Sequence, residues 1–209
     1  MKGPQPRSRW YDGFLYRMGA DPIAAGAFLK TVSSYVSDHE SVIDIGCGVG
    51  TLVVGLAGKC SRVTGVELSP RMAAYAGRRL KARGIRNAQI ILASATDLSS
   101  HVPGRYDFAV MTQFLHELSD EVRDGVMSEA LKVAGGFIIA DFIAPFPDTL
   151  KGRLIRLLEM CAGREHNRNF RKWLEGGGLD GFLERYGLKV VQERRFSNGA
   201  GKIVKAVPR

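Results

Sequence analysis

The strongest structural signal in the chain is the stretch Val42-Ile43-Asp44-Ile45-Gly46-Cys47-Gly48-Val49-Gly50-Thr51. A short apolar run of strand character leads into a turn in which alternate residues lack a side chain. Glycine permits backbone angles that other residues rarely adopt, and it lets a ligand lie directly against the main chain. The helix that follows begins with amide groups that have no partner within the helix. The stretch therefore predicts a strand, a ligand-binding turn and a helix in succession.

Outward from this turn, apolar runs of strand length alternate with segments of helical period. The predicted strands span residues 41–45, 62–67, 88–93, 106–112 and 137–143. The predicted helices run from 22 to 37, from 51 to 59, from 70 onward and from 119 to 133, and Gly135-Gly136 should end the last of these. Such alternation is typical of a parallel sheet covered by helices.

The last third of the chain has a different pattern. Residues 148–161 predict an amphipathic helix whose apolar face comprises Leu150, Leu154, Leu157, Leu158 and Cys161. A polar and aromatic segment, 164–170, comes before a second predicted helix at 179–186. Two strand-like runs, 188–196 and 202–207, flank Asn198-Gly199, which is a strong hairpin signal.

The predicted fold is a three-layer α-β-α sandwich with a mostly parallel seven-stranded sheet and a C-terminal antiparallel hairpin. We expect a single domain of 209 residues. Within it, residues 1–40 would form an N-terminal helical cap and 41–145 a cofactor-binding core. Residues 146–187 would form a helical insertion at the acceptor site, and 188–209 the terminal hairpin.

The glycine spacing and a nearby acid narrow the ligand class. A nicotinamide-binding turn reads G-x-G-x-x-G, whereas this one reads G-x-G-x-G. Glu67 ends the next predicted strand, where a carboxylate can accept hydrogen bonds from both hydroxyls of a ribose. The pattern favours a cofactor that contains adenosine. The alternative is a turn that only packs a helix, with Glu67 as a solvated strand end.

The stretch 42–50 resembles the first motif of class I S-adenosylmethionine-dependent methyltransferases, including the methyltransferase-domain and quinone-biosynthesis group. Residues 66–69, 92–98, 106–110 and 135–142 resemble the second to fifth motifs. The resemblance implies the cofactor S-adenosylmethionine, its product S-adenosylhomocysteine (SAH), and a Rossmann-like fold.

The resemblance also implies which residues contact the cofactor. These are Asp44, Gly46, Cys47, Gly48, Gly50, Glu67, Leu68, Met72, Ser94, Ala95, Gln113 and Phe114. Glu67 would bind the ribose hydroxyls, and Gln113 and Phe114 would lie near the reactive methyl group. Ser94 stands where many relatives carry an acid that contacts adenine, so either Ser94 or Asp97 would take that contact.

Methyl transfer is an in-line displacement in which the protein mainly aligns the acceptor and excludes water. A base is needed only when the acceptor starts protonated. His116 has a suitable intrinsic pKa and is the candidate catalytic residue, although it could equally help to cap a helix. The candidate acceptor-binding residues are Tyr11, Tyr16, His116, Asp141, Arg164, His166 and Asn169. Alternatively, Tyr11 and Tyr16 would be aromatics that only pack in the core, Asp141 would be a helix cap, and residues 164–170 would form a solvated loop.

Composition limits the remaining classes. The three cysteines lie far apart without a C-x-x-C pair, so we predict reduced thiols and no metal site. No secretory signal or membrane span is predicted, which favours the cytoplasm. The net charge of +9 is spread along the chain.

A small-molecule acceptor is therefore favoured over RNA or another nucleic acid. The sequence has neither an N/D-P-P-Y/F motif nor a Pro-Cys nucleophile for a pyrimidine ring. A non-catalytic protein that binds the cofactor is the third alternative. The sequence makes no prediction about the oligomeric state.

Overall fold

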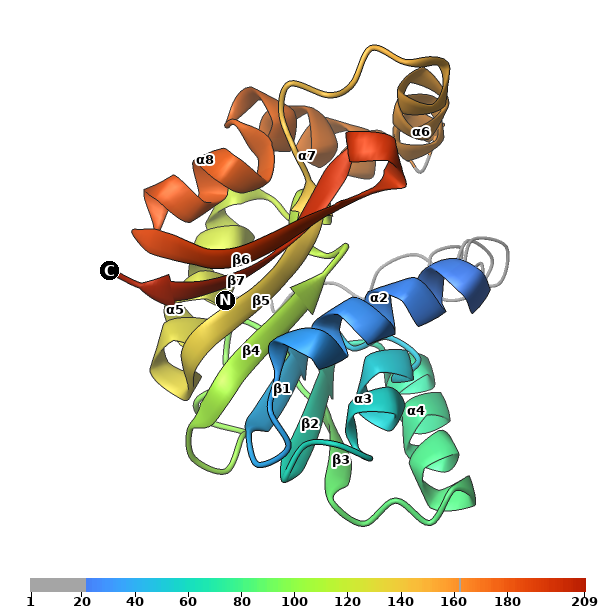
Figure 1. Ribbon diagram of the computed structural model, residues 1–209, viewed down its shortest axis with the longest axis vertical. Helices are drawn as coiled ribbons and strands as arrows, with labels where there is room; N and C mark the ends of the chain where they lie inside the picture. The colour runs from blue at the N-terminus through green and yellow to red at the C-terminus, as the bar shows by residue number, and fades with distance from the viewer. Residues whose placement is uncertain (1–21, 162) are drawn as a thin grey trace. The chain divides into compact units, whose positions relative to one another are not determined.

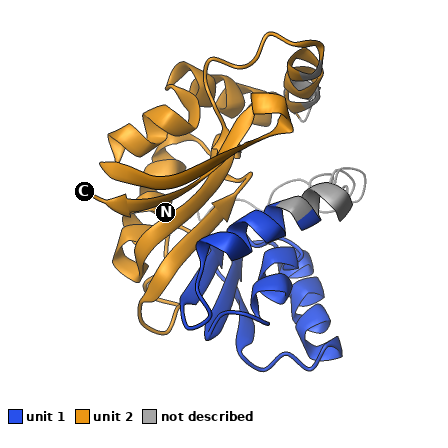
Figure 2. Cartoon of the chain, viewed as in Figure 1, with its two compact units in different colours: residues 1–94 blue, residues 95–209 orange. Residues whose placement is uncertain are grey.

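The structure is a computed structural model that describes residues 22–161 and 163–209 (Figure 1). The chain forms two compact units, residues 1–94 and 95–209, shown in blue and orange in Figure 2. Within the described residues, no helix has both the length and the apolar character that crossing a membrane requires. The four-part division expected from the sequence stays a prediction.

The first unit contains three parallel strands. Its elements are α2 (Pro22–Tyr35), β1 (Ser41–Ile45), α3 (Thr51–Leu56), β2 (Arg62–Glu67), α4 (Pro70–Ala82) and β3 (Ala88–Leu92). Strand β2 pairs in parallel with β1 on one side and β3 on the other. Val42, Ile43 and Val63 are fully buried. The strand and helix order matches the prediction, with α3 ending three residues and β3 one residue earlier.

Helix α4 begins as its sequence predicts. Ser69 has an extended backbone, and its hydroxyl accepts a hydrogen bond from the amide of Met72. Pro70 occupies the first turn, where its missing N–H costs no helical hydrogen bond. The serine and proline together fix the point at which the chain leaves β2.

The second unit contains two parallel strands followed by an antiparallel pair. Its elements are β4 (Tyr106–Thr112), η1 (Leu115–Glu117), α5 (Asp120–Val133), β5 (Ala134–Phe142), α6 (Leu150–Cys161), α7 (Arg164–Glu175), α8 (Gly178–Arg185), β6 (Leu188–Phe196), η2 (Ser197–Gly199) and β7 (Gly201–Pro208). Strands β4 and β5 are parallel, and β7 is antiparallel to both β5 and β6. The predicted hairpin is confirmed, with Asn198 and Gly199 at φ 54° and 89°.

The prediction that Gly135-Gly136 ends a helix is wrong. Strand β5 already begins at Ala134, so both glycines belong to the strand. Gly136 pairs with Phe108 of β4, and a Cβ atom at Gly136 would lie 2.5 Å from the Phe108 ring. The glycine therefore serves close packing within the sheet and not a turn.

The polar segment 164–170 begins helix α7, which the sequence did not predict. Phe170 and Trp173 are buried on one side of this helix, while Arg168 and Arg171 are exposed. Because most residues of this helix are polar, its narrow apolar face gives no clear helical period in the sequence. The helix predicted at 148–161 is confirmed as α6, but Leu150, Leu154 and Leu157 of its predicted apolar face are 87 %, 55 % and 56 % exposed.

Candidate active site

The glycine turn after β1 has the conformation that its sequence requires. Gly46, Gly48 and Gly50 all have positive φ, at 74°, 55° and 73°. The amides of Gly46 and Cys47 both donate to the carbonyl of Val66, at 2.9 and 3.0 Å. A residue with a side chain is strained in this region of φ, so each glycine in the motif is needed for the shape of the turn.

Glu67 lies at the end of β2 and contacts this turn directly. Its carboxylate accepts a hydrogen bond from the amide of Gly48 at 2.9 Å and another from the amide of Ser69 at 2.7 Å. Each carboxylate oxygen has a second lone pair, so Glu67 can accept further hydrogen bonds from a ligand that lies on the turn. The structure therefore brings together the two features that carry the adenosine prediction.

Asp44 is a second acid at this position. It is 2 % exposed and pairs in register with Gly65 of β2. Burial, with a further contribution from the charge of Glu67, raises the pKa of Asp44 to about 7. A ligand that brings positive charge or hydrogen-bond donors to the turn would relieve this unfavourable pair of acids.

The other predicted cofactor contacts in the first unit differ in exposure. Cys47 and Met72 are buried, whereas Leu68 is exposed. Burial, then the charges of Asp44 and Glu67, raises the pKa of the Cys47 thiol. The Cys47 side chain is therefore an uncharged packing group in the turn.

The proposed adenine contacts follow β3. Ser94 is the last residue of the first unit and Ala95 the first of the second, and both are partly buried. Asp97, the alternative adenine contact, is about half exposed and lies 3.2 Å from His101 four residues later. The choice between Ser94 and Asp97 stays a prediction.

In the second unit, Gln113 directly follows β4 in a strained conformation. Its φ is 50°, and its amide donates to the carbonyl of Ala140 at 2.8 Å. The side-chain Nε2 is buried and has no hydrogen-bond partner among the described residues. A buried amide without a partner is costly, and strain of this kind concentrates at functional positions. Gln113 can thus donate to a ligand, and Phe114 lies beside it in the sequence.

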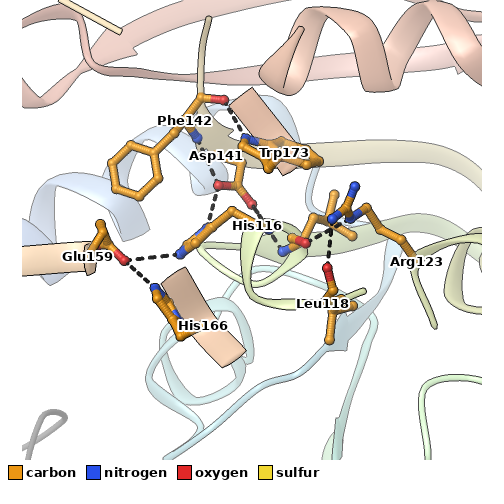
Figure 3. Close-up of polar contacts among 9 residues, drawn as sticks. His116, Leu118, Arg123, Asp141, Phe142, Glu159, His166 and Trp173 are labelled. Atoms are coloured by element: carbon orange, nitrogen blue, oxygen red, sulfur yellow. Dashed lines mark hydrogen bonds and ion pairs between the residues drawn. The ribbon is translucent and has the colours of Figure 1, made fainter. Parts of the chain in front are cut away.

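His116 and Asp141 form a buried pair (Figure 3). Nδ1 of His116 donates to Oδ1 of Asp141 at 2.6 Å, and their side chains are 3 % and 1 % exposed. Asp141 also accepts hydrogen bonds from the amides of Leu115, His116 and Phe142. Asp141 therefore caps η1 and orients the imidazole ring at the same time.

Two further side chains complete a cluster around His116. Nε2 of His116 lies 3.6 Å from Oε2 of Glu159 on α6, and Nε2 of His166 on α7 donates to the same oxygen at 2.7 Å. Figure 3 shows both imidazole rings facing this carboxylate, each joined to it by a dashed line. We call His116, Asp141, Glu159 and His166 the histidine–carboxylate cluster.

The cluster shifts the pKa values of its members. Burial alone lowers the pKa of His116, but its contacts with the carboxylates of Asp141 and Glu159 outweigh burial and raise it to about 10. Burial raises the pKa of Glu159, but the contacts with His116 and His166 lower it to about 2. At neutral pH the free protein thus holds a protonated His116 beside an ionised Glu159.

The remaining predicted acceptor residues do not gather in this cluster. The side-chain amide of Asn169 is buried and donates to the carbonyl of Glu117 at 2.8 Å, which ties α7 to η1. Arg164 is exposed and helps to line a hollow of about 430 Å³ on the surface of α7, together with Asn167, Arg168, Arg171, Lys172 and Glu175. Tyr11 and Tyr16 lie outside the described residues.

Glu159 was missed by the sequence analysis. It falls within the amphipathic helix predicted at 148–161, and an acidic residue among the polar residues of such a helix does not by itself indicate a functional site. Arg123 was missed too: its guanidinium donates to the carbonyls of Leu115 and Leu118 and lies over the ring of Trp173. The spacing of Glu159 and His166 would indicate a contact between them only if the helix were known to end before Gly163 and a second helix to begin after it.

Comparison with known proteins agrees with this geometry. Residues 42–135 match the family model of a methyltransferase domain. A solved protein from Pyrococcus horikoshii OT3 superposes with a TM-score of 0.73 at 19 % identity, over 98 % of this chain and 100 % of that one. Magnesium protoporphyrin IX methyltransferase from Synechocystis PCC 6803, solved with bound SAH, has a TM-score of 0.63 at 19 % identity, over 100 % and 90 % of the two chains.

Curated relatives match only in part. A tRNA/tmRNA (uracil-C(5))-methyltransferase from Neisseria meningitidis is 28 % identical over 127 residues, which cover 56 % of this chain and 35 % of the relative. A ubiquinone biosynthesis O-methyltransferase from Thiobacillus denitrificans is 28 % identical over 99 residues, or 47 % and 42 % of the two chains. The matched part of the chain thus spans less than half the length of either relative.

These findings confirm the predicted fold. The chain has the class I methyltransferase fold, with seven strands in a mostly parallel arrangement, antiparallel strands at the C-terminus and flanking helices. Residues 42–135, just under half of the chain, match the model of a methyltransferase domain.

Proposed function

We propose that the protein transfers a methyl group from S-adenosylmethionine to a small-molecule acceptor by in-line displacement. The observation that carries this proposal is the turn in which Gly46, Gly48 and Gly50 all adopt positive φ while Glu67 accepts the amide of Gly48. The turn lies in the segment that matches a methyltransferase domain, and a solved protein of the same fold holds SAH.

The cofactor suits the charges around this turn. Glu67 would accept hydrogen bonds from the ribose hydroxyls, and the positive charge of the cofactor would offset the burial and the repulsion from Glu67 that together raise the pKa of Asp44. Gln113 would donate its unpaired Nε2–H to the cofactor or the acceptor. The cofactor already carries an activated methyl group, so these residues bind and align.

We place the acceptor near the histidine–carboxylate cluster. The pKa of about 10 favours a protonated His116 at neutral pH, which speaks against a general base in the free protein. His116 as the catalytic residue stays a proposal, and an imidazolium there would instead donate a hydrogen bond to the acceptor. A cytoplasmic location, where free Cys47 and Cys60 stay reduced, belongs to the same proposal.

An RNA acceptor is the second candidate. Four exposed basic side chains, Arg164, Arg168, Arg171 and Lys172, line the hollow on α7 and would attract phosphates. Attack on a uracil ring, as the name of the Neisseria relative implies for that protein, requires an accessible thiolate. Among the cysteine side chains that the structure describes, Cys47 and Cys60 are buried, and burial raises the pKa of both thiols. Neither of these two thiols suits such an attack, which favours the small molecule.

The test is SAH release from S-adenosylmethionine in the presence of acceptor panels. One panel holds phenols, quinols and amines, and the other holds unmodified tRNA transcripts. The Gly48→Val variant is the control for contaminating activity, because its turn cannot keep φ at 55°. Turnover with small molecules supports the proposal. Turnover with tRNA alone would favour the second candidate function, methyl transfer to RNA. Cofactor binding without turnover in either panel favours a non-catalytic protein.

A further inference from the structure

The histidine–carboxylate cluster contains a set of three metal-binding side chains, of which the methyl-transfer proposal uses only His116. One ring nitrogen of His116, one of His166 and a carboxylate oxygen of Glu159 all lie within 4.8 Å of one another. They come from η1 and from the consecutive helices α6 and α7, all within the second unit (Figures 2 and 3). Two imidazoles and one carboxylate are ligands that zinc and other divalent first-row metals bind well.

The surroundings of His116 match those of a metal-bound imidazole. A histidine that binds a metal through one ring nitrogen usually donates the other N–H to a carboxylate or a carbonyl. Nδ1 of His116 donates to Asp141 at 2.6 Å, and Asp141 is held by three backbone amides. This arrangement fixes the ring so that Nε2 faces Glu159.

The distances require little rearrangement. In a tetrahedral site with bonds of about 2.1 Å, ligand atoms lie about 3.4 Å apart. The separations from Oε2 of Glu159 are 3.6 Å to His116 and 2.7 Å to His166. Small side-chain rotations would therefore admit an ion between them.

The cluster is sheltered but not sealed. The ring of Phe142 lies 4.9 Å from that of His116, and the ring of Phe170 stacks on that of His166 with centroids 6.5 Å apart. Such apolar walls exclude water and strengthen electrostatic interactions with an ion. Glu159 is 22 % exposed, which leaves a path to solvent.

We propose that His116, Glu159 and His166 bind one divalent transition-metal ion, with zinc as the expected metal, and that Asp141 orients His116 without contacting the ion. Three protein ligands leave a coordination position open for water or for the oxygen of an acceptor. On binding, the ion replaces the protons that the two Nε2 atoms hold toward Glu159, and these protons pass to solvent. The site needs no cofactor, so its test does not depend on methyl transfer.

The experiment is calorimetric titration of the full chain with Zn²⁺ after removal of metals with a chelator, together with elemental analysis of the dialysed protein. We expect one ion per chain with a Kd in the micromolar range or below. Glu159→Gln and His166→Asn should each weaken binding at least tenfold, as the loss of a ligand requires. Both variants keep the His116–Asp141 pair, and circular dichroism establishes that they are folded.

The matched control is His101→Asn, which removes an exposed histidine that also pairs with a carboxylate. It should leave zinc binding unchanged. The proposal is overturned if the folded wild-type chain binds no zinc at millimolar concentration. It is also overturned if Glu159→Gln and His166→Asn bind zinc as tightly as His101→Asn does, since the ion would then lie elsewhere.

Discussion

The glycine turn of the first unit and the histidine–carboxylate cluster of the second are built from different groups. The turn consists of main-chain amides between Gly46 and Gly50, with one carboxylate from the next strand. The cluster consists of side chains from η1, β5, α6 and α7, and the main chain serves only to hold Asp141. The glycine turn depends on residues that permit a particular backbone conformation. The histidine–carboxylate cluster depends instead on which helices pack against one another.

The same contrast appears in the buried aspartates. Asp44 is destabilised as an anion by burial and by Glu67, which raises its pKa to about 7. Asp141 is equally buried but faces three amides and an imidazole. The first unit thus holds an acid that a ligand would satisfy, and the second holds one that the protein itself satisfies.

The largest effect should come from filling the turn. A Cβ atom at Gly50 would lie 2.8 Å from the Cβ of Ala76, on top of the strain of φ 73°. Gly50→Ala should lower the free energy of unfolding by about 2–4 kcal/mol and abolish measurable cofactor binding. The control is Gly84→Ala, where φ is 64° but space is open, with an expected loss of about 1 kcal/mol. Equal losses in urea unfolding would refute the clash at Gly50.

The next effect concerns the two His–Asp pairs of the second unit. Asp141→Asn removes the charge that the buried His116 faces and should cost about 3 kcal/mol in the free energy of unfolding. Asp97→Asn removes the partner of the exposed His101 and should cost under about 0.5 kcal/mol. Both values come from denaturant titrations. A small loss for Asp141→Asn would mean that the cluster is not held by this pair.

A smaller effect is expected from the acid beside the turn. Glu67→Ala should weaken binding of S-adenosylmethionine by about 1–3 kcal/mol, because hydrogen bonds to a charged partner are lost. Glu40→Ala is the matched control, since Glu40 also accepts a backbone amide of the first unit, from Ser37, but precedes β1, whereas the turn follows it. Calorimetry on the folded variants decides, and unchanged affinity in Glu67→Ala would overturn the ribose assignment.

The smallest effect is a pH dependence of stability from Asp44. Its pKa is raised in the folded state, so the folded protein binds the proton more tightly than the unfolded chain does. Its contribution is full below about pH 4 and is lost as pH rises to about 7. As the pH rises from about 5 to about 7, the wild type should therefore lose about 1–2 kcal/mol of unfolding free energy that the Asp44→Asn variant keeps. Parallel pH profiles for the two proteins would contradict the raised pKa.

The sequence was sufficient for the described part of the first unit, residues 22–94, because its signals are local. Alternate glycines, Ser69-Pro70 and the apolar runs each specify a conformation within a few residues, and the structure has all of them. The Asn198-Gly199 hairpin was predictable for the same reason. Gly136 was misread because its role depends on Phe108, a residue of another strand.

The cluster could not be predicted in this way. His116, Asp141 and His166 were singled out one by one, but nothing in their spacing places Glu159 between the two histidines. That requires the packing of α7 against α6 and η1, and α7 itself was not predicted because only a narrow face of it is apolar. Tertiary contact, and not local propensity, assembles this site.

The most direct test of the central claim is calorimetric titration of the purified protein with S-adenosylmethionine and, separately, with NAD. The G-x-G-x-G turn and its contact with Glu67 predict micromolar binding of S-adenosylmethionine and no binding of NAD. Binding of neither, in folded protein free of carried-over ligand, would contradict the assignment of the turn as a cofactor site. Binding of NAD alone would place the protein in a different class of cofactor-dependent enzyme.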